Sequence, residues 1–236
     1  MDYSEAIAQI RDVLSEVIPQ HGSLGFSGGL DSTLIMHLSG YRLKGYTAGF
    51  NDSHDVRRSQ QVSKALDFSI RIISLEKIDI ESHLRLLKEI DETITRSEIG
   101  YELILSIIMS TVDDDTVITG QGADEFFYGY RKAIESRSNS EQVAKLLQRT
   151  LPREKKMAKY YRKDLITPYL DDRITSIARS FGPDQHIRDG TGKAMIRDVA
   201  RISGLPDMIY GYGKKAAQYG SGIDRYLKRT KYFLIL

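Results

Sequence analysis

The chain has 236 residues, of which 28% are charged, and it contains no cysteine. This length allows one large α/β domain, or one domain with helical additions, with a sizeable buried core. The lack of cysteine excludes disulfides, thiolate metal sites and a cysteine nucleophile, and it favours a cytoplasmic protein. No window of about 18 apolar residues occurs, and the first residues have the pattern of an acidic amphipathic helix, so we expect neither a membrane span nor a signal peptide.

Positive charge is concentrated in the C-terminal third. Residues 1–150 carry 16 Lys and Arg against 23 Asp and Glu, whereas residues 151–236 carry 18 against 9. A basic surface of this size suits a polyphosphate or a nucleic acid. The same side chains spread over several helices would also be typical of an ordinary solvated surface.

Short β-branched and aromatic runs alternate with helical patterns in the first half of the chain. This alternation predicts an α/β fold with a Rossmann-like parallel sheet. After Tyr130 no further strand is expected, and the rest is predicted to be helical. The four predicted strands are 23–27 (SLGFS), 45–50 (GYTAGF), 68–75 (FSIRIISL) and 115–120 (DTVITG).

A glycine-rich turn, SGGLDS, follows the first predicted strand and opens a helix. Backbone N–H groups of such a turn, together with a helix N-terminus, form a cradle for an anion such as phosphate. The spacing matches neither the mononucleotide P-loop, because no lysine follows the glycines, nor the dinucleotide G-x-G-x-x-G motif. Asp31 would repel phosphate unless a cation lies between them, so it predicts Mg²⁺. The alternative is a tight turn in which Asp31 and Ser32 cap the helix.

A second glycine cluster, ITGQGADEFFYGY at 118–130, also follows a predicted strand. It brings Asp124 and Glu125 to the carboxyl edge of the sheet, where open α/β sheets bind ligands. If the first and fourth predicted strands are neighbours, Asp31 and Asp124 face one crevice and together suit Mg²⁺ on a pyrophosphate. The alternative is that the two acids only complement a helix N-terminus.

The stretch SGGLDS resembles the pyrophosphatase loop of enzymes that cleave ATP between its α and β phosphates. That superfamily includes asparagine, β-lactam, argininosuccinate, GMP and NAD synthetases and tRNA-modifying enzymes, so the loop alone does not identify the acceptor. The resemblance implies a sheet of the adenine nucleotide alpha hydrolase type, ATP and Mg²⁺ as cofactors, and release of pyrophosphate.

The order of the other motifs is similar to the synthetase domain of asparagine synthetase. This resemblance implies one such domain over residues 1–236, with a nucleotide-binding core over 1–135, a helical region with a lysine loop over 136–236, and no glutaminase domain. The matching stretches are 118–130, which resembles G-E-G-S-D-E-x-F-G-G-Y, 47–66, 167–174 (TPYLDDRI), 192–206 (GKAMIRDVARISGLP) and 211–222 (GYGKKAAQYGSG).

The resemblance also assigns roles to residues. It implies that Asp31 and Asp124 hold Mg²⁺ and that a lysine of the last stretch meets the developing charge. Counting back from Gly222 without a gap gives Lys214, with Lys215 as the alternative; a lysine pair among glycines by itself predicts a mobile cationic flap. The residues expected at ATP and pyrophosphate are Phe26, Ser27, Gly28, Gly29, Leu30, Asp31, Ser32, Gly120 and Gly122.

Three features depart from the asparagine synthetase pattern. Gln121 stands where the motif has its first glutamate, which the family uses in proton handling, and an amide does not titrate. Ala123 replaces the motif's serine. The catalytic cysteine of the family's glutaminase domain is missing, so we expect ammonia from solution or from a separate glutaminase, or a different nucleophile.

Four further residues are weaker candidates. Arg96 is a candidate for a substrate carboxylate or phosphate, or for pairing with Glu98 at a helix start. Lys193 and Arg197, one helical turn apart, are candidates for phosphate binding or for a structural role. Glu125 accompanies Asp124 in the second cluster.

The leading hypothesis is an ATP-dependent ligase that adenylylates a small carboxylate, most simply aspartate, and transfers the acyl group to an amine. One alternative is a tRNA- or nucleobase-modifying pyrophosphatase, although no known RNA-binding module is recognisable. The other is a nucleotide-binding regulator without catalytic activity. The sequence leaves the oligomeric state open.

Overall fold

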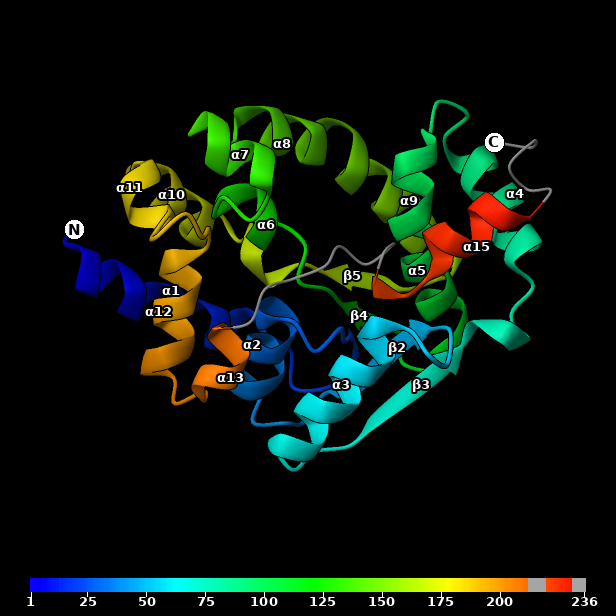
Figure 1. The fold of residues 1–236 in the computed structure, drawn as a ribbon, viewed down its shortest axis with the longest axis horizontal. Coiled ribbons are helices and arrows are strands. Elements are labelled where there is room, and N and C mark those ends of the chain that lie inside the picture. The colour runs from blue at the N-terminus through cyan, green and yellow to red at the C-terminus, as the bar shows by residue number, and fades with distance from the viewer. Residues whose placement is uncertain (212–219, 231–236) are drawn as a thin grey trace.

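The computed structural model describes residues 1–211 and 220–230, and its centre is a five-stranded parallel sheet flanked by helices (Figure 1). The strands are β1 (Ser23–Gly25), β2 (Lys44–Gly49), β3 (Ile70–Ser74), β4 (Thr116–Ile118) and β5 (Asp164–Ile166). Their order in the sheet is β3-β2-β1-β4-β5, and every pairing is parallel. The predicted α/β fold with a Rossmann-like sheet is confirmed.

Helices connect and cover the strands. Three short helical segments are the 3₁₀ turns η1 (Leu75–Lys77) and η3 (Pro168–Leu170) and the π-helical turn η2 (Leu146–Thr150). The α-helices in the described residues are α1 (Tyr3–Val17), α2 (Leu30–Leu38), α3 (His54–Ala65), α4 (Ile80–Ile90), α5 (Arg96–Thr111), α6 (Ala123–Phe126), α7 (Arg131–Ser136), α8 (Ser140–Lys145), α9 (Leu151–Tyr160), α10 (Asp172–Ser180), α11 (Pro183–His186), α12 (Ala194–Ile202), α13 (Asp207–Tyr210) and α15 (Ile223–Arg229).

The four predicted strands form β1 to β4, and the fifth strand was not expected. β5 lies in the region predicted to be entirely helical, and it pairs with β4 through Thr116↔Asp164, Val117↔Leu165 and Ile118↔Ile166. Its three residues are too few to show the alternation that identifies a strand in a sequence. The prediction of a wholly helical second half was therefore wrong at this point, because the free edge of β4 takes up the segment.

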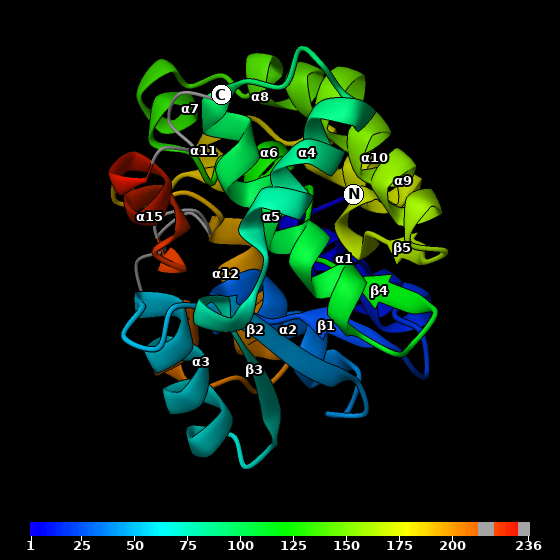
Figure 2. The ribbon, with the colours of Figure 1, turned by 90° about the vertical axis from the view of Figure 1, so that its right-hand side faces the viewer.

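Two hydrophobic cores lie on opposite faces of the sheet. Because successive strand residues point to opposite faces, Val117 joins one core and Ile118 the other. The Ile118 core includes residues of α1, α2, α10 and α12, and the Val117 core includes residues of α4, α5, α9 and α15. Figure 2 shows α4 and α5 side by side against the strands. Both faces of the sheet are therefore covered by helices.

The end of the chain packs against its beginning. Helix α12 contacts α1 and α2, and the hydroxyl of Tyr3 donates a hydrogen bond of 2.7 Å to the buried Asp198 on α12. This packing holds the glycine-rich turn before α12 close to the loop between β1 and α2. None of the described helices combines the length and the apolar character needed to cross a membrane.

A buried ion network joins α4, α5 and α9. The guanidinium of Arg153, whose side chain is 1% exposed, lies 2.8 Å from Glu102 Oε1, 2.7 Å from Asp91 Oδ2 and 3.4 Å from Glu98 Oε1. Burial alone would raise the pKa of Glu98, but hydrogen bonds from Thr95 and the nearby arginines lower it to about 2. Burial raises the pKa of Glu102 to about 7, against the opposing effect of Arg153.

We expect Arg153→Met to destabilise the fold. Removing the guanidinium leaves buried carboxylates without their counter-charge, which typically costs about 3–5 kcal/mol. Chemical denaturation measures this loss in the free energy of unfolding. The matched control is Arg131→Met, which breaks the exposed Arg131–Glu135 pair and should change stability little. Equal effects of the two substitutions would contradict the central role of Arg153.

Candidate active site

The loop between β1 and α2 has the geometry of an anion cradle. Gly28 has a φ of +68°, and a Cβ there would lie 2.9 Å from the backbone nitrogen of Ser59, so the turn requires glycine. The hydroxyls of Ser27 and Ser32 lie 3.3 Å apart. Helix α2 begins after Gly29, which has no side chain to cap the first turn. Ser32 Oγ accepts a hydrogen bond of 3.3 Å from the backbone N–H of Ser27, and the helix N-terminus faces the loop.

The second loop lies beside the first. Strands β1 and β4 are neighbours, with Leu24 paired to Ile118. This is the condition under which Asp31 and Asp124 were predicted to face one crevice. The residues after β4 turn into α6, and the backbone N–H of Gln121 donates to Thr119 Oγ1 at 3.4 Å. Asp124 in the first turn of α6 thus comes to the same sheet edge as Asp31.

Lys193 joins the two carboxylates. Its Nζ lies 2.7 Å from Asp31 Oδ2 and 2.5 Å from Asp124 Oδ1, and the residue is only 5% exposed. Lys193 is the N-cap of α12 and adopts a φ of +62°, which is uncommon for a residue with a side chain. Asp31 and Asp124 therefore converge on one point, and in this structure the cation at that point is a lysine.

The approach of these groups depends on a glycine. A Cβ on Gly129 would lie 2.0 Å from Asp124 Oδ1 and 2.6 Å from Lys193 Cε, so no side chain fits there. The backbone N–H of Lys193 also donates to the carbonyl of Phe127 at 2.8 Å. The turn before α12 is thus anchored to the loop after α6.

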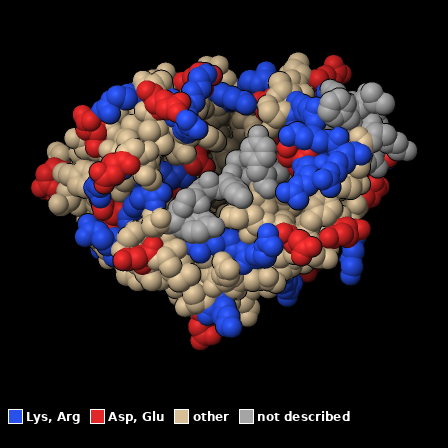
Figure 3. Space-filling view, in the orientation of Figure 1, with Lys and Arg blue, Asp and Glu red and all other residues tan. Residues whose placement is uncertain are grey.

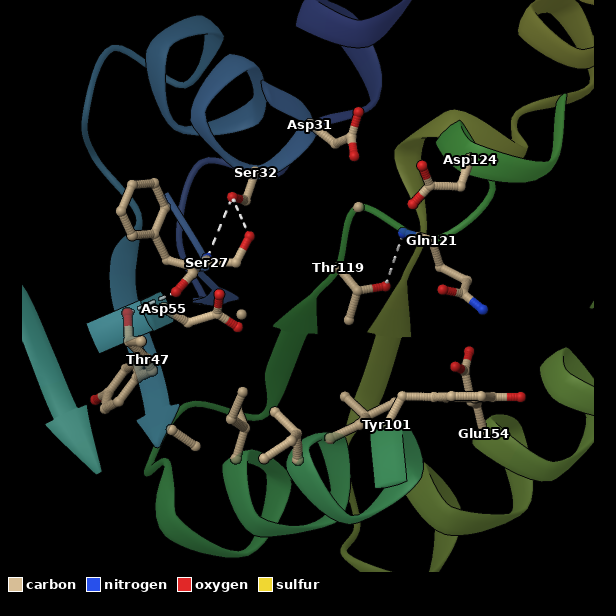
Figure 4. Close-up of a pocket in the computed structure, with 18 of the residues that line it drawn as sticks. Ser27, Asp31, Ser32, Thr47, Asp55, Tyr101, Thr119, Gln121, Asp124 and Glu154 are labelled. Carbon is tan, nitrogen blue, oxygen red and sulfur yellow. Dashed lines mark hydrogen bonds between the residues drawn. The ribbon is translucent and has the colours of Figure 1, made fainter. Parts of the chain in front are cut away.

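A cavity opens between the two loops and α5 (Figure 4). One part of its wall is apolar, and another part carries Asp31, Asp124, Glu125 and Glu154. Figure 3 shows a hollow on this face of the molecule with Lys and Arg gathered around it. The apolar wall includes Phe26, Tyr46, Ala48, Ile104, Leu105 and Ile108.

Most of the residues proposed from the sequence lie around two adjoining cavities. Asp124 lines both of them. The main cavity is lined by Phe26, Ser27, Asp31, Ser32, Gly120, Gln121, Asp124 and Glu125, and the second by Gly29, Leu30, Lys193 and Arg197. Gly28 and Gly122 shape the backbone of the two loops, each with a positive φ.

Other predicted residues lie elsewhere. Arg96 begins α5 and is not among the described residues that line either cavity. Glu98, its suggested partner, forms a capping box with Thr95 and ion pairs with Lys145, Arg149 and Arg153. Lys214 and Lys215 fall outside the described residues.

The described residues on either side of that stretch lie near the cavities. Ile209, two residues before Gly211, lines the second cavity, and a Cβ on Gly220 would lie 2.0 Å from the carboxylate of Asp55, which lines the main one. Asp55 is buried, and His54 Nδ1 lies 3.1 Å from its Oδ1.

Sequence reasoning missed two acidic residues of the main cavity. No motif singles out Asp55, although its position at the start of α3, after β2, brings it to the carboxyl edge where ligands bind. Glu154 lies on α9, and no motif surrounds it in the sequence. Its place in the cavity wall results from the packing of α9 against α5.

A parallel sheet with two glycine-rich loops at its carboxyl edge is typical of nucleotide-binding α/β proteins. The family model of asparagine synthase matches residues 22–166, more than half of the chain, and the chain belongs to this family. This membership agrees with the predicted fold class, a parallel sheet of the adenine nucleotide alpha hydrolase type.

The proteins similar to this chain include the following relative and two solved structures. A candidate glutamine-hydrolysing asparagine synthetase from Methanocaldococcus jannaschii is 27% identical over 253 aligned positions, which cover 86% of this chain and 46% of the relative, so the chain spans about half the relative's length. A tRNA methyltransferase subunit from the same organism has a TM-score of 0.39 at 16% identity, covering 83% of this chain and 93% of that one. The NH3-dependent NAD synthetase of Campylobacter jejuni has a TM-score of 0.43 at 16% identity, covering 100% and 88%.

We expect Lys193→Met to destabilise the protein in metal-free buffer and to make it respond to Mg²⁺. Without the ammonium, Asp31 and Asp124 repel each other, which costs about 3 kcal/mol for a buried pair that loses its partner. A divalent cation that binds between them stabilises the folded state. Thermal denaturation with and without Mg²⁺ measures both effects.

The matched control is Lys156→Met, since Lys156 is exposed on α9. Its thermal midpoint should respond to Mg²⁺ as the wild type does. An equal Mg²⁺ response in Lys193→Met would show that the two carboxylates do not form a cation site.

Proposed function

We propose that this domain is an ATP-dependent carbon–nitrogen ligase of the asparagine synthase type. In the proposed reaction a carboxylate oxygen of the substrate, most simply aspartate, attacks the α-phosphorus of ATP, and the bond from this phosphorus to the bridging oxygen breaks with release of pyrophosphate. An amine then attacks the acyl carbon, the bond to AMP breaks, and an amide forms. Family membership supports an ATP-using ligase, and the choice of acid and amine belongs to the proposal.

The observation that carries this proposal is the convergence of Asp31 and Asp124 on one cation. Two carboxylates from adjacent strand ends, beside a loop with the geometry of an anion cradle, suit a metal-bound polyphosphate better than an uncharged ligand. Lys193 at the same point adds a positive charge for phosphate oxygens. The second cavity, with Lys193 and Arg197, offers pyrophosphate further positive charge.

The described residues fit Mg²⁺. Both carboxylates lie within 2.7 Å of a single atom, Lys193 Nζ, which stands in for a bound cation. Mg²⁺ is usually held by one or two carboxylates together with phosphate oxygens and water, so two protein ligands suffice. No larger cluster of acidic and histidine ligands occurs in residues 1–211 and 220–230. When bound, Mg²⁺ would neutralise charge on the polyphosphate and make pyrophosphate a better leaving group.

The cavity suggests how ATP would lie. Its apolar wall, with Phe26, Ala48 and Ile108, suits the adenine base, and Ser27 and Ser32 would receive the phosphates. The carboxylate substrate would approach from the side of Gln121. Gln121 can orient a substrate through hydrogen bonds, but it cannot move a proton.

The proposal keeps two expectations from the sequence. Lys214, or its neighbour Lys215, would meet charge that develops during acyl transfer, because the described segments on either side of the lysine stretch lie near the cavities. Ammonia would come from solution or from a separate glutaminase, and residues 1–236 would act as one synthetase domain.

A second candidate is an enzyme that modifies a tRNA or a nucleobase with the same ATP chemistry. Basic side chains of α9 and the segment before β5 gather around a surface groove, and such a cluster attracts a polyanion. The groove is lined by Lys155, Lys159, Arg162 and Lys163, with Ala158, Asp164 and Leu165. Affinity for tRNA that falls steeply with salt concentration would support this candidate.

The reaction can be tested by measuring pyrophosphate and orthophosphate from MgATP. Aspartate, glutamate, other small acids and tRNA are screened one at a time, each with ammonia. Pyrophosphate released with one acid only would identify the substrate. Nucleotide binding without pyrophosphate release in any mixture would favour a regulator instead.

We expect Asp31→Asn to lower pyrophosphate release at least about 100-fold, because the variant loses a metal ligand and a charge partner of Lys193. Circular dichroism and thermal denaturation establish that the variant is folded. Asp113→Asn, at an exposed position after α5, is the control and should keep wild-type activity. Undiminished turnover in Asp31→Asn would contradict the proposed reaction.

A further inference from the structure

Glu154 is a buried carboxylate that none of the proposed steps uses. It is 3% exposed, it lies on α9, and it lines the same cavity as Gln121 and Asp124. Its Oε2 is buried without a hydrogen-bond partner among the described residues. A buried carboxylate usually has a partner, so one left without any at the wall of a cavity points to a ligand with a proton or a positive charge.

The surroundings of Glu154 favour a bound proton or cation. The acidic groups that face it are Glu102 on α5 and Glu125 on α6, and the basic group is Arg153, which precedes it on α9. Arg153 is already held by Glu102 and Asp91. Burial, and then the two neighbouring carboxylates, raise the pKa of Glu154 well above its usual value. This carboxylate therefore has a stronger tendency to accept a proton than an exposed glutamate.

The helix that carries Glu154 begins with an irregular turn. The π-helical turn Leu146–Thr150 comes directly before α9, and Pro152 cannot donate a backbone hydrogen bond to it. One extra residue in a helical turn rotates all later side chains around the helix axis. Arg153 and Glu154, although adjacent, are both buried.

Gln121 and Glu154 face each other across the cavity. In Figure 4 the amide of Gln121 points from the loop after β4 toward the carboxylate of Glu154, which points back from α9. Asp31 and Asp124 are both paired with Lys193, and Glu125 accepts a hydrogen bond from Tyr130. Asp55, the remaining carboxylate of the lining, lies 3.1 Å from His54 Nδ1. Among the carboxylates that line this cavity, Glu154 is thus the one best suited to exchange a proton.

We propose that Glu154 accepts the proton of the attacking amine, a task for which the amide of Gln121 is unsuited. In this step the amine nitrogen forms a bond to the acyl carbon and gives one proton to Glu154, while the bond from that carbon to the AMP oxygen breaks and AMP leaves with the electron pair. Glu154 then releases the proton to solvent. This inference rests on the proposed ligase function, and it names the group that accepts the proton of the amine.

The test separates the two halves of the reaction. Exchange of labelled pyrophosphate into ATP reports adenylation, and amide formation from ammonia reports transfer. We expect Glu154→Gln to keep exchange within about threefold and to lose amide formation by at least about 100-fold, the usual contribution of a general base. Hydroxylamine is mostly unprotonated at neutral pH, so its transfer should fall much less.

Rescue provides a second readout. The double variant Glu154→Gln with Gln121→Glu returns a carboxylate to the opposite wall and should recover ammonia transfer at least about tenfold. In the wild type, transfer should decline as the pH falls and Glu154 becomes protonated, and this decline should disappear in Glu154→Gln. Glu92→Gln, at an exposed position before α5, is the matched control and should leave both half-reactions unchanged.

The outcomes distinguish the hypotheses. Equal losses of exchange and transfer in a folded Glu154→Gln variant, or full transfer activity, would overturn the role of Glu154. A wild-type protein without pyrophosphate exchange for any tested acid would instead overturn the proposed function.

Discussion

The ion triad of Asp31, Lys193 and Asp124 is the constraint on which this site depends. Two carboxylates at adjacent strand ends would repel each other in a largely buried place, and a neighbouring cation makes their approach stable. Each member comes from a different helix start, on α2, α6 and α12. The triad therefore connects the first loop, the second loop and the C-terminal part of the chain in one local structure.

Packing far from the site determines where Lys193 lies. Helix α12 lies against α1 and α2 and shares their core on one face of the sheet. On the other face, the Arg153 network holds α9 against α4 and α5. The two groups of helices thus bring a lysine to the loops from one side and a carboxylate, Glu154, from the other.

The Arg153 network and the neighbouring Glu154 differ in how far their charges are compensated. Arg153 is surrounded by Glu98, Glu102 and Asp91, which form a stable internal network. Glu154 lies next to this network but receives no hydrogen bond within the described residues, and it borders the cavity. A group of this kind stabilises the fold little, and its position at the cavity wall fits the role proposed for it.

The sequence by itself determined the parallel sheet, four of its five strands and both glycine-rich loops, because turns and strand ends depend on neighbouring residues along the chain. It also predicted that Asp31 and Asp124 would face one crevice, since carboxyl ends of adjacent parallel strands meet at one edge. Only the tertiary structure decided that β5 completes the sheet, that Lys193 lies between the two acids, and that Glu154 enters the cavity. Those placements depend on contacts between segments far apart in the chain, for which no local pattern exists.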